Sequence, residues 1–257
     1  DGKRLIVQPN TFNMYCHREP RFYLTVVWNG QWFKWENRNT NFLYGQPDGG
    51  PTHDAPQNGY LNRSRVSLDY IPRDNNHPYR PAIIFRMAEA YLSYAEALNE
   101  SSERMSHKQE ILDNLNKIRH RAGIAEYGTG TDENGFTRIK INFSDQKEVR
   151  RLIHKERRVE FVGEGVRYHD LRRWKTAHYG IGNLNEQGEN PDWGVNGPDY
   201  GMNYYGTEYT DQGDNAFFKR TKYMDRVYPR KFYWYPIHQS EIDKDPTLVQ
   251  GPFWLGE

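Results

Sequence analysis

Apolar and polar side chains alternate through residues 21–37, on both sides of an Asn29-Gly30 dipeptide. Alternation with a period of two is typical of a β-strand that buries one face. Asn-Gly is the favoured two-residue loop of a type I′ hairpin, in which Trp28 pairs with Gln31. The pattern therefore predicts a small β-hairpin over these residues.

The same alternation sorts the tryptophans of this hairpin onto two faces. One face is apolar and is expected to be buried; it carries Leu24, Val26, Trp28, Phe33 and Trp35. The other face is mixed and is expected to be a surface; it carries Tyr23, Thr25, Val27, Trp32, Lys34 and Glu36. We therefore expect Trp28 and Trp35 to pack inward and Trp32 to face outward.

A helical period follows a loop-like stretch. Residues 37–81 are rich in Gly, Pro, Asn and Asp, so residues 1–81 are expected to hold the hairpin and loops. Two apolar stripes of helical spacing come next: Ile84, Ala88, Tyr91, Leu92, Ala95 and Leu98, then Ile111, Leu115, Ile118 and Ala122. Gly123 fits a helix C-cap. Residues 82–124 are thus predicted to form a helical hairpin, close in length to the roughly 34-residue tetratricopeptide unit.

A charged pair of helices is predicted over residues 145–177. Asp145 and Glu148 have the spacing of a capping box at the start of the first helix. The run Gly163-Glu164-Gly165 interrupts the helical pattern, which resumes at Val166. The remaining residues, 178–257, are expected to be a loop-rich tail, with a long irregular segment from Gly180 to Gly213.

The overall charge and the single cysteine exclude several classes of protein. The chain has 257 residues and 35 basic against 34 acidic side chains, a balance that argues against nucleic acid or an anionic membrane as the main partner. Cys16 alone cannot form a disulfide framework. The sequence contains no run of 18 apolar residues, so no membrane-spanning segment is expected.

The most charged stretch, residues 154–174, contains carboxylates that could serve as a catalytic site. Two of the carboxylates Glu156, Glu160 and Glu164 could form the pair that glycoside hydrolysis requires. Each lies within one helical turn of an arginine, however, and ion pairing lowers a carboxylate pKa, which disfavours a general acid. We therefore predict that the chain is not an enzyme. A structural ion network is expected to join the two helices through Glu156, Arg157, Glu160, Arg167 and Asp170.

No cofactor is expected. The histidines do not follow the spacing of a zinc protease, and the sequence has no phosphate-binding loop. Calcium remains an alternative in the acidic loop that holds Asp192, Asp199, Asp211 and Asp214, although their spacing matches no known calcium loop.

Aromatic residues on loops are the strongest candidates for a binding site. A sugar ring has an apolar C–H face, which an aromatic plate covers, and an edge of hydroxyls, which amide and charged groups bind. The predicted ligand-binding residues are Trp32, Asn29, Trp193, Tyr200, Tyr204 and Tyr205. The alternative is that these rings pack the loops onto the body of the protein.

Five segments in series resemble the SusD/RagB family of nutrient-binding lipoproteins of Bacteroidetes. They are PRFYLTVVWNG (20–30), RMAEAYLSYAEALNE (86–100), LNKIRHRAGI (115–124), LIHKERRVEFVGEGVRYHDLRRWK (152–175) and YPIHQSEIDKDPTLVQGP (235–252). Their order and spacing suit the C-terminal half of that family, and they run through nearly all of residues 1–257.

The resemblance implies a mainly α, SusD-like fold with a tetratricopeptide-type hairpin, a small β-hairpin and long irregular loops. It implies a protein that captures oligosaccharide at the cell surface and delivers it to a SusC-like TonB-dependent outer-membrane transporter. It also implies a lipid anchor in the outer membrane, through a cysteine that this chain lacks. A peptide-binding lid of the same transporter, a glycosidase and a pure scaffold are the alternatives. No ligand residue is carried over from the family, so the site prediction rests on the aromatic residues above.

Overall fold

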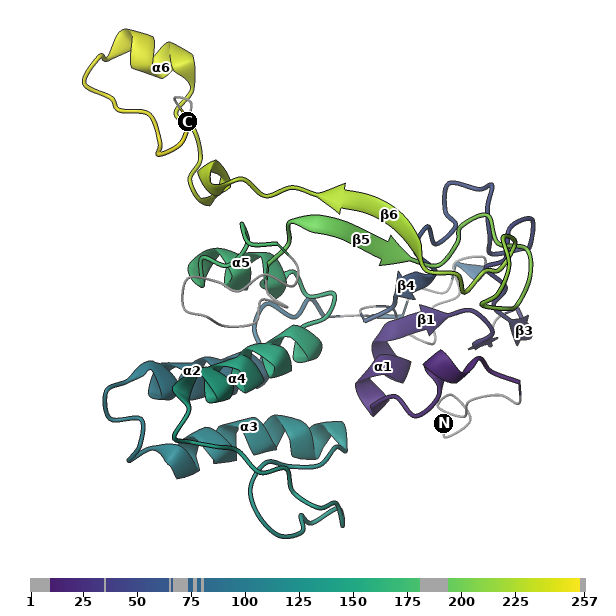
Figure 1. The fold of residues 1–257 in the computed structure, drawn as a ribbon, viewed down its shortest axis with the longest axis horizontal. Helices are drawn as coiled ribbons and strands as arrows, with labels where there is room; N and C mark the ends of the chain where they lie inside the picture. The colour runs from purple at the N-terminus through teal and green to yellow at the C-terminus, as the bar shows by residue number, and fades with distance from the viewer. Residues whose placement is uncertain are drawn as a thin grey trace. The chain divides into compact units, whose positions relative to one another are not determined.

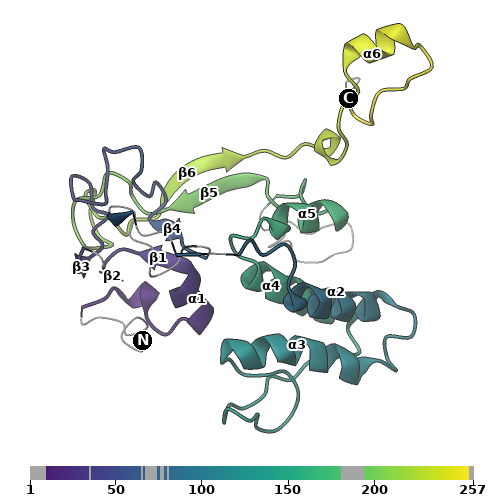
Figure 2. The same cartoon turned by 180° about the vertical axis from the view of Figure 1, so that it is seen from behind.

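The computed structural model describes residues 10–34, 36–64, 66, 74–75, 78–79, 81–180 and 194–254. The chain divides into two compact units (Figures 1 and 2). The first unit contains Asp1–Gly165 and Met202–Arg220, and the second contains Val166–Gly201 and Thr221–Glu257. Among the described residues, the helices are all too short or too polar to cross a bilayer.

Three helices of the first unit form what we call the helical layer (Figure 1). Helix α2 (Met87–Glu100) packs against both α3 (Lys108–Ala122) and α4 (Gln146–Glu160). Its interior is aliphatic, with fully buried Leu92, Ala95, Ile111, Leu115, Val149 and Ile153. The predicted helical hairpin is confirmed. Its predicted start was too early, because Ile84 precedes α2 and is almost fully exposed.

The predicted caps of these helices are also confirmed. Gly123 ends α3 in the left-handed region, with φ of 67°, where a side chain would be strained. The carboxylate of Asp145 accepts hydrogen bonds from the backbone N–H groups of Lys147 and Glu148 at the start of α4. The spacing of local capping residues thus predicted both helix ends correctly.

The predicted β-hairpin at Asn29-Gly30 is wrong. Residues Pro20–Thr25 form a short helix, α1, whose first residue is a proline that needs no N–H partner there. Strand β1 (Val26–Trp28) pairs with β4 (Tyr60–Asn62), and β2 (Trp32–Phe33) pairs with β3 (Arg38–Asn39). The strands flanking the turn therefore have different partners.

The turn itself exists, and its geometry explains the error. The Gln31 N–H donates to the Trp28 carbonyl at 3.2 Å, which closes a β-turn around Asn29 and Gly30. Of these two central residues only Gly30 has a positive φ, 91°, as in a type II turn. A type I′ turn needs a positive φ at both, and a type II turn splays the two strands that it connects.

The predicted burial of Trp28 and exposure of Trp32 are confirmed. Trp28 is 3% exposed and Trp32 is 44% exposed, as predicted. Leu24, predicted to be buried, is half exposed because it lies on α1 and not on a strand. Trp35 lies outside the described residues.

One face of β1 packs into what we call the aromatic core, which comprises Tyr15, Tyr23, Trp28, Phe42, Met202, Phe217 and Phe218. Short segments from both ends of the first unit build it. Phe12 stacks on Phe218 with ring centres 3.8 Å apart, and the Phe12 N–H donates to the Tyr209 hydroxyl at 3.1 Å. The strand alternation places Trp28 and its cross-strand partner Tyr60 on this side of β1.

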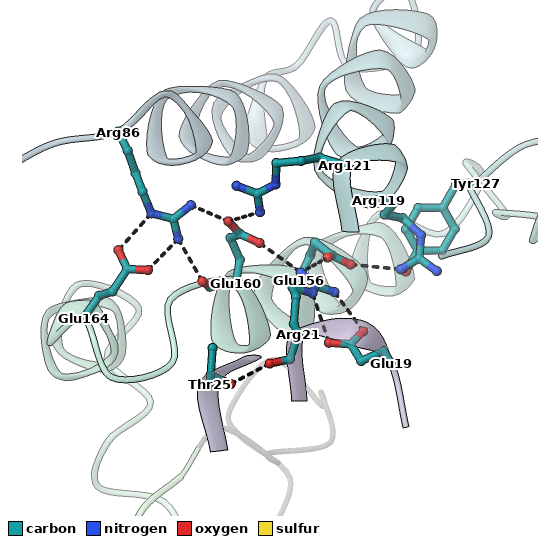
Figure 3. A network of polar contacts seen from close by, with 10 residues as sticks. All are labelled: Glu19, Arg21, Thr25, Arg86, Arg119, Arg121, Tyr127, Glu156, Glu160 and Glu164. Carbon is teal, nitrogen blue, oxygen red and sulfur yellow. Dashed lines mark hydrogen bonds and ion pairs between the residues drawn. The ribbon is translucent and has the colours of Figure 1, made fainter. Parts of the chain in front are cut away.

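A buried ion network connects the aromatic core to the helical layer (Figure 3). Arg21, on α1, binds Glu156 at 2.7 Å and Glu160 at 3.1 Å, both on α4. Glu160 also binds Arg86 and Arg121, and its side chain is only 1% exposed. Glu156 binds Arg119 of α3 at 2.9 Å. Helix α1 thus places Tyr23 in the aromatic core and Arg21 in the network.

The network contains the predicted Glu156 and Glu160 together with basic partners that the sequence did not predict. A structural role for Glu156 and Glu160 was predicted, but their partners here come from α1, α3 and the residue preceding α2. Asp170 and Arg167 belong to the second unit, where Asp170 binds Arg173 at 2.9 Å and Arg167 lies over the Trp174 ring. Burial alone would raise the pKa of Glu160, yet hydrogen bonds from Arg86 and Arg121 outweigh it and hold that pKa below its usual value.

The second unit contains α5 (Val166–Arg173), strands β5 (Gly197–Gly201) and β6 (Thr221–Arg226), a 3₁₀ turn at Arg230–Tyr233 and α6 (Gln239–Lys244). Its small core is Leu171, Ala177 and Tyr228. Helix α5 is confirmed. The antiparallel β5–β6 pair was missed, because β6 is exposed along its whole length and shows no alternation, while β5 begins with Gly and Pro.

Candidate functional site

A cavity of about 240 Å³ lies beside Trp32 in the first unit. It is lined by Val27, Gln31, Trp32, Phe33, Lys34, Thr40, Leu61, Asn62, Arg63 and Val66. Typical small-molecule sites measure roughly 300–1,000 Å³, so this cavity suits one ring of a ligand and not a long chain. The ring would enter beside an exposed indole.

Two short sheets build this cavity from opposite sides. Strand alternation turns Trp28 into the aromatic core and therefore turns its neighbour Val27 outward, opposite Leu61 of β4. On β2, Trp32 faces outward across from Asn39 of β3. The type II turn separates the two sheets, and the cavity is lined by residues from both.

The walls of the cavity combine an apolar surface with a few polar groups. Trp32, Leu61 and Val66 are each 40–49% exposed, a cluster of apolar side chains that solvent reaches. Gln31 is 5% exposed, and its side-chain Oε1 is buried with no hydrogen-bond partner among the described residues. A buried acceptor left unpaired costs about 1–3 kcal/mol.

Asn29 does not lie at the surface of this cavity. It is 2% exposed, and its Oδ1 accepts a hydrogen bond from the Phe42 N–H at 2.7 Å. The expected surface position of Asn29 is therefore wrong. The amide side chain thus binds the backbone of the loop that follows β3, where no neighbouring strand does so. This hydrogen bond explains why an Asn is buried at this position.

Tyr204 and Tyr205 form a separate cluster with Tyr44. The ring centres of Tyr44 and Tyr205 are 5.5 Å apart, and those of Tyr204 and Tyr205 are 5.1 Å apart. Tyr204 is fixed against the backbone at Gly50, where an added Cβ would lie 2.6 Å from its ring. Tyr205 is 69% exposed, so most of its ring is accessible to solvent. Neither residue lines the cavity at Trp32.

The remaining predicted site residues lie elsewhere. Tyr200 is on β5 in the second unit and is partly exposed. Trp193 lies outside the described residues. Among the predicted residues that the structure describes in the first unit, Tyr204 and Tyr205 lie together, and Trp32 has other neighbours.

Sequence reasoning missed most of the cavity lining but not all of it. Val27, Trp32 and Lys34 were assigned to one surface by alternation alone, and all three line the cavity. Leu61 and Asn62 were missed because they come from a segment that reads as loop. The cross-strand pairing of β1 with β4 carries no local sequence signal.

A larger cavity of about 860 Å³ lies between α3 and the loop of residues 126–143. Many of its polar groups already bind one another. Glu126 binds Arg138 at 2.9 Å, Asn116 exchanges hydrogen bonds with the Tyr127 backbone, and Lys117 lies over the Tyr91 ring. Fewer groups are left for a ligand here than the size of the cavity suggests.

Two of the four acidic residues proposed as calcium ligands form ion pairs, and a third, Asp192, lies outside the described residues. Asp214 binds Lys219 at 2.8 Å, and Asp199 binds Arg226. Within the part of the chain that the structure describes, no three His, Cys, Asp or Glu side chains gather as metal ligands would. Glu160, the most enclosed carboxylate of the charged helix, has a lowered pKa, which does not suit a general acid.

Known proteins match this chain along most of its length. The SusD family model covers residues 6–254. Two curated relatives from Formosa agariphila, SusD-like proteins P25 and P38, are each 32% identical, over 109 and 103 residues. The matches cover 42% and 40% of this chain, and 18% and 19% of the relatives.

A solved SusD-like protein from Bacteroides fragilis matches the structure with a TM-score of 0.63 and 27% identity. That match covers 96% of this chain and 41% of the solved one. The chain thus spans about two-fifths of that solved relative and less than a fifth of each curated one.

Proposed function

The chain belongs to the SusD family, and we propose that it is a non-enzymatic module that binds an oligosaccharide at the cavity beside Trp32. One sugar ring stacks its C–H face on the exposed indole. The ring edge then reaches the polar side chains of the cavity wall. The observation that carries the proposal is a solvent-exposed tryptophan at a cavity whose wall combines apolar and polar side chains.

The shape of the site suits capture and release better than chemistry. A cavity that holds a single ring leaves the rest of a glycan in solvent, so the chain can bind the end or a side branch of a long polymer. Stacking on a rigid indole loses little conformational entropy, because the ring has only two rotatable bonds. No metal or cofactor is needed for either contact.

We place this module at the cell surface, attached to the outer membrane through a lipid anchor carried by the protein to which it belongs. Its partner would be a SusC-like TonB-dependent transporter that receives the glycan. Family membership supports this placement. The solved and curated relatives are much longer than this chain, so the partner contacts of the whole protein are part of the proposal.

Binding to a panel of oligosaccharides tests the proposal, measured by calorimetry and by retardation in polysaccharide-containing gels. Trp32→Ala should weaken binding at least about tenfold, which corresponds to about 1.4 kcal/mol. Trp32→Phe should retain part of it, since a smaller ring still stacks. Thermal melts should show both variants folded, because substitutions of surface side chains usually change stability by less than about 0.5 kcal/mol.

Tyr205→Ala is the matched control, because it removes an exposed ring that does not line the cavity. It should bind as the parent does. If Tyr205→Ala loses binding and Trp32→Ala keeps it, the site is the tyrosine cluster. If the parent binds peptides and no glycan, the protein is a peptide-binding lid, and if it cleaves a glycan, it is a glycosidase; either result overturns the proposal.

A further inference from the structure

We propose that the glycan bound beside Trp32 is anionic, and that Lys34 binds its carboxylate or sulfate group. This inference rests on the proposed function, and it names the chemical class of the ligand. It follows from the charges that line the cavity and from the way in which nearby charges are already paired.

The cavity lining is cationic, although the chain as a whole is nearly neutral. Among the described residues that line it, two are basic, Lys34 and Arg63, and none is acidic. The larger cavity beside α3 provides the contrast, because acids and bases are mixed among its lining residues: Asp113, Glu126 and Glu133 with Lys117, His120, Arg138 and Lys140. The excess of positive charge is therefore a local property of the Trp32 cavity.

Lys34 has no competing partner among the described residues. Its ammonium group makes no ion pair or hydrogen bond with them, although Lys34 is exposed at the rim of the cavity. The nearby acids are engaged by Arg38, which binds Asp48 through two hydrogen bonds of 2.6 and 2.9 Å and lies 3.9 Å from Glu36. An anion that reached Lys34 would thus meet a cation whose charge is not neutralised.

Lys34 lies close to the exposed indole along the chain. Trp32 is on β2, Lys34 is the first residue after that strand, and both line the cavity. Arg63 follows the end of β4, on the opposite wall. A ring lying on the indole would therefore present a substituent of its edge to Lys34.

The ammonium group of Lys34 then binds the charged substituent of the ligand. An ammonium binds carboxylate or sulfate oxygens through charge-assisted hydrogen bonds, which are about twice as strong as neutral ones. The apolar residues Val27, Phe33 and Leu61 lower the local dielectric and so strengthen that attraction.

Matched pairs of glycans test the inference, because each pair differs in charge and not in backbone. One pair is oligogalacturonate and its methyl ester; the other is a sulfated galactan oligosaccharide and its desulfated form. The charged member of at least one pair should bind the parent about tenfold or more tightly than the neutral member. Which pair responds tells carboxylate from sulfate. The preference should shrink at high salt, which screens the attraction.

Lys34→Gln should remove most of the preference for the charged member, because it should weaken binding of the charged member far more than that of the neutral member. Lys140→Gln is the matched control, since Lys140 is an exposed lysine that lines the other cavity. If charged and neutral members bind equally, and Lys34→Gln behaves as the parent while Trp32→Ala loses binding, the inference is overturned and the proposed function stands. If no glycan binds, charged or neutral, both fail.

Discussion

In the helical layer, the buried apolar side chains are aliphatic and come from three helices that lie within residues 87–160. In the aromatic core, the buried side chains are mostly rings and come from segments at residues 12–60 and 202–218. Both regions belong to the first unit. They differ in how far along the chain each contact reaches.

This difference explains where sequence alone succeeds. A helix repeats its buried positions every three or four residues, so the stripe of α3 is visible without any knowledge of α2 or α4. A ring in the aromatic core has no such periodicity, because its neighbours are set by strands of two or three residues and by loops. The ion network then joins the two regions at α1 and α4.

The largest effect is expected where the two regions meet. Glu160→Ala leaves Arg21 and Arg86 without a shared buried carboxylate, and removing one partner of a buried ion pair costs about 3–5 kcal/mol. Chemical denaturation should show this loss, while ligand binding at the Trp32 cavity stays unchanged. Glu103→Ala, an exposed control, should melt as the parent does. A parental melting temperature for Glu160→Ala would mean that the network does not hold the regions together.

A similar loss, confined to the aromatic core, is expected from Trp28→Ala. Removing a buried tryptophan costs about 3–5 kcal/mol, because the cavity that it leaves collapses only in part. Trp32→Ala is the internal control, four residues away and exposed. Near-ultraviolet circular dichroism and thermal melts should separate the two variants. Equal melting temperatures would show that burial does not distinguish these rings.

A smaller effect is expected from overpacking the helical layer. Ala95 is fully buried on α2, and a larger side chain there should cost about 1–3 kcal/mol. Ala95→Phe should lower the denaturation midpoint, and Ala97→Phe, on the exposed side of the same helix, should not. Tolerance of Phe at position 95 would contradict the close packing of these helices.

A still smaller effect on stability is expected at the end of α3, where a substitution changes only the backbone strain. A Cβ at Gly123 would meet only a Pro20 side-chain carbon at 3.9 Å, so the cost of Gly123→Ala comes from its positive φ and should be about 1 kcal/mol. Gly123→Asn should lose less, since Asn tolerates the left-handed region. Equal stability of all three proteins in urea would exclude a strained cap.

Acidification should gradually weaken the ion network that connects the aromatic core to the helical layer. The pKa of Glu160 is lowered in the folded protein from its usual 4.5, so the folded state binds fewer protons than the unfolded state near that pH. Its contribution to stability is therefore complete above about 4.5 and is lost as the pH falls through the lower, folded pKa. Melting temperatures measured from pH 7 to 3 should show a steeper acid decline for the parent than for Glu160→Ala.

The sequence predicted helices α2 to α5, the end of α3, the start of α4 and the exposure of Trp28 and Trp32, all of which depend on residues within one or two turns or strands. It could not predict that β1 pairs with β4, since 31 or more residues separate the partners and nothing local marks the pairing. The same limit applied to the site. Trp32 and Lys34 were identified as surface residues, but the opposite wall, with Leu61 and Arg63, required the fold.

The hydrogen bond from Phe12 to Tyr209 spans 197 residues and carries a consequence for the order of folding. Closing so long a loop is entropically costly, and contacts distant in sequence form slowly. During synthesis, α2 and α3 can dock as soon as both have been made, whereas Tyr15, Tyr23 and Trp28 must wait for Phe217 and Phe218. The aromatic rings therefore stay open to other chains for most of the time that the protein takes to be made, and this interval is when it is most prone to aggregate.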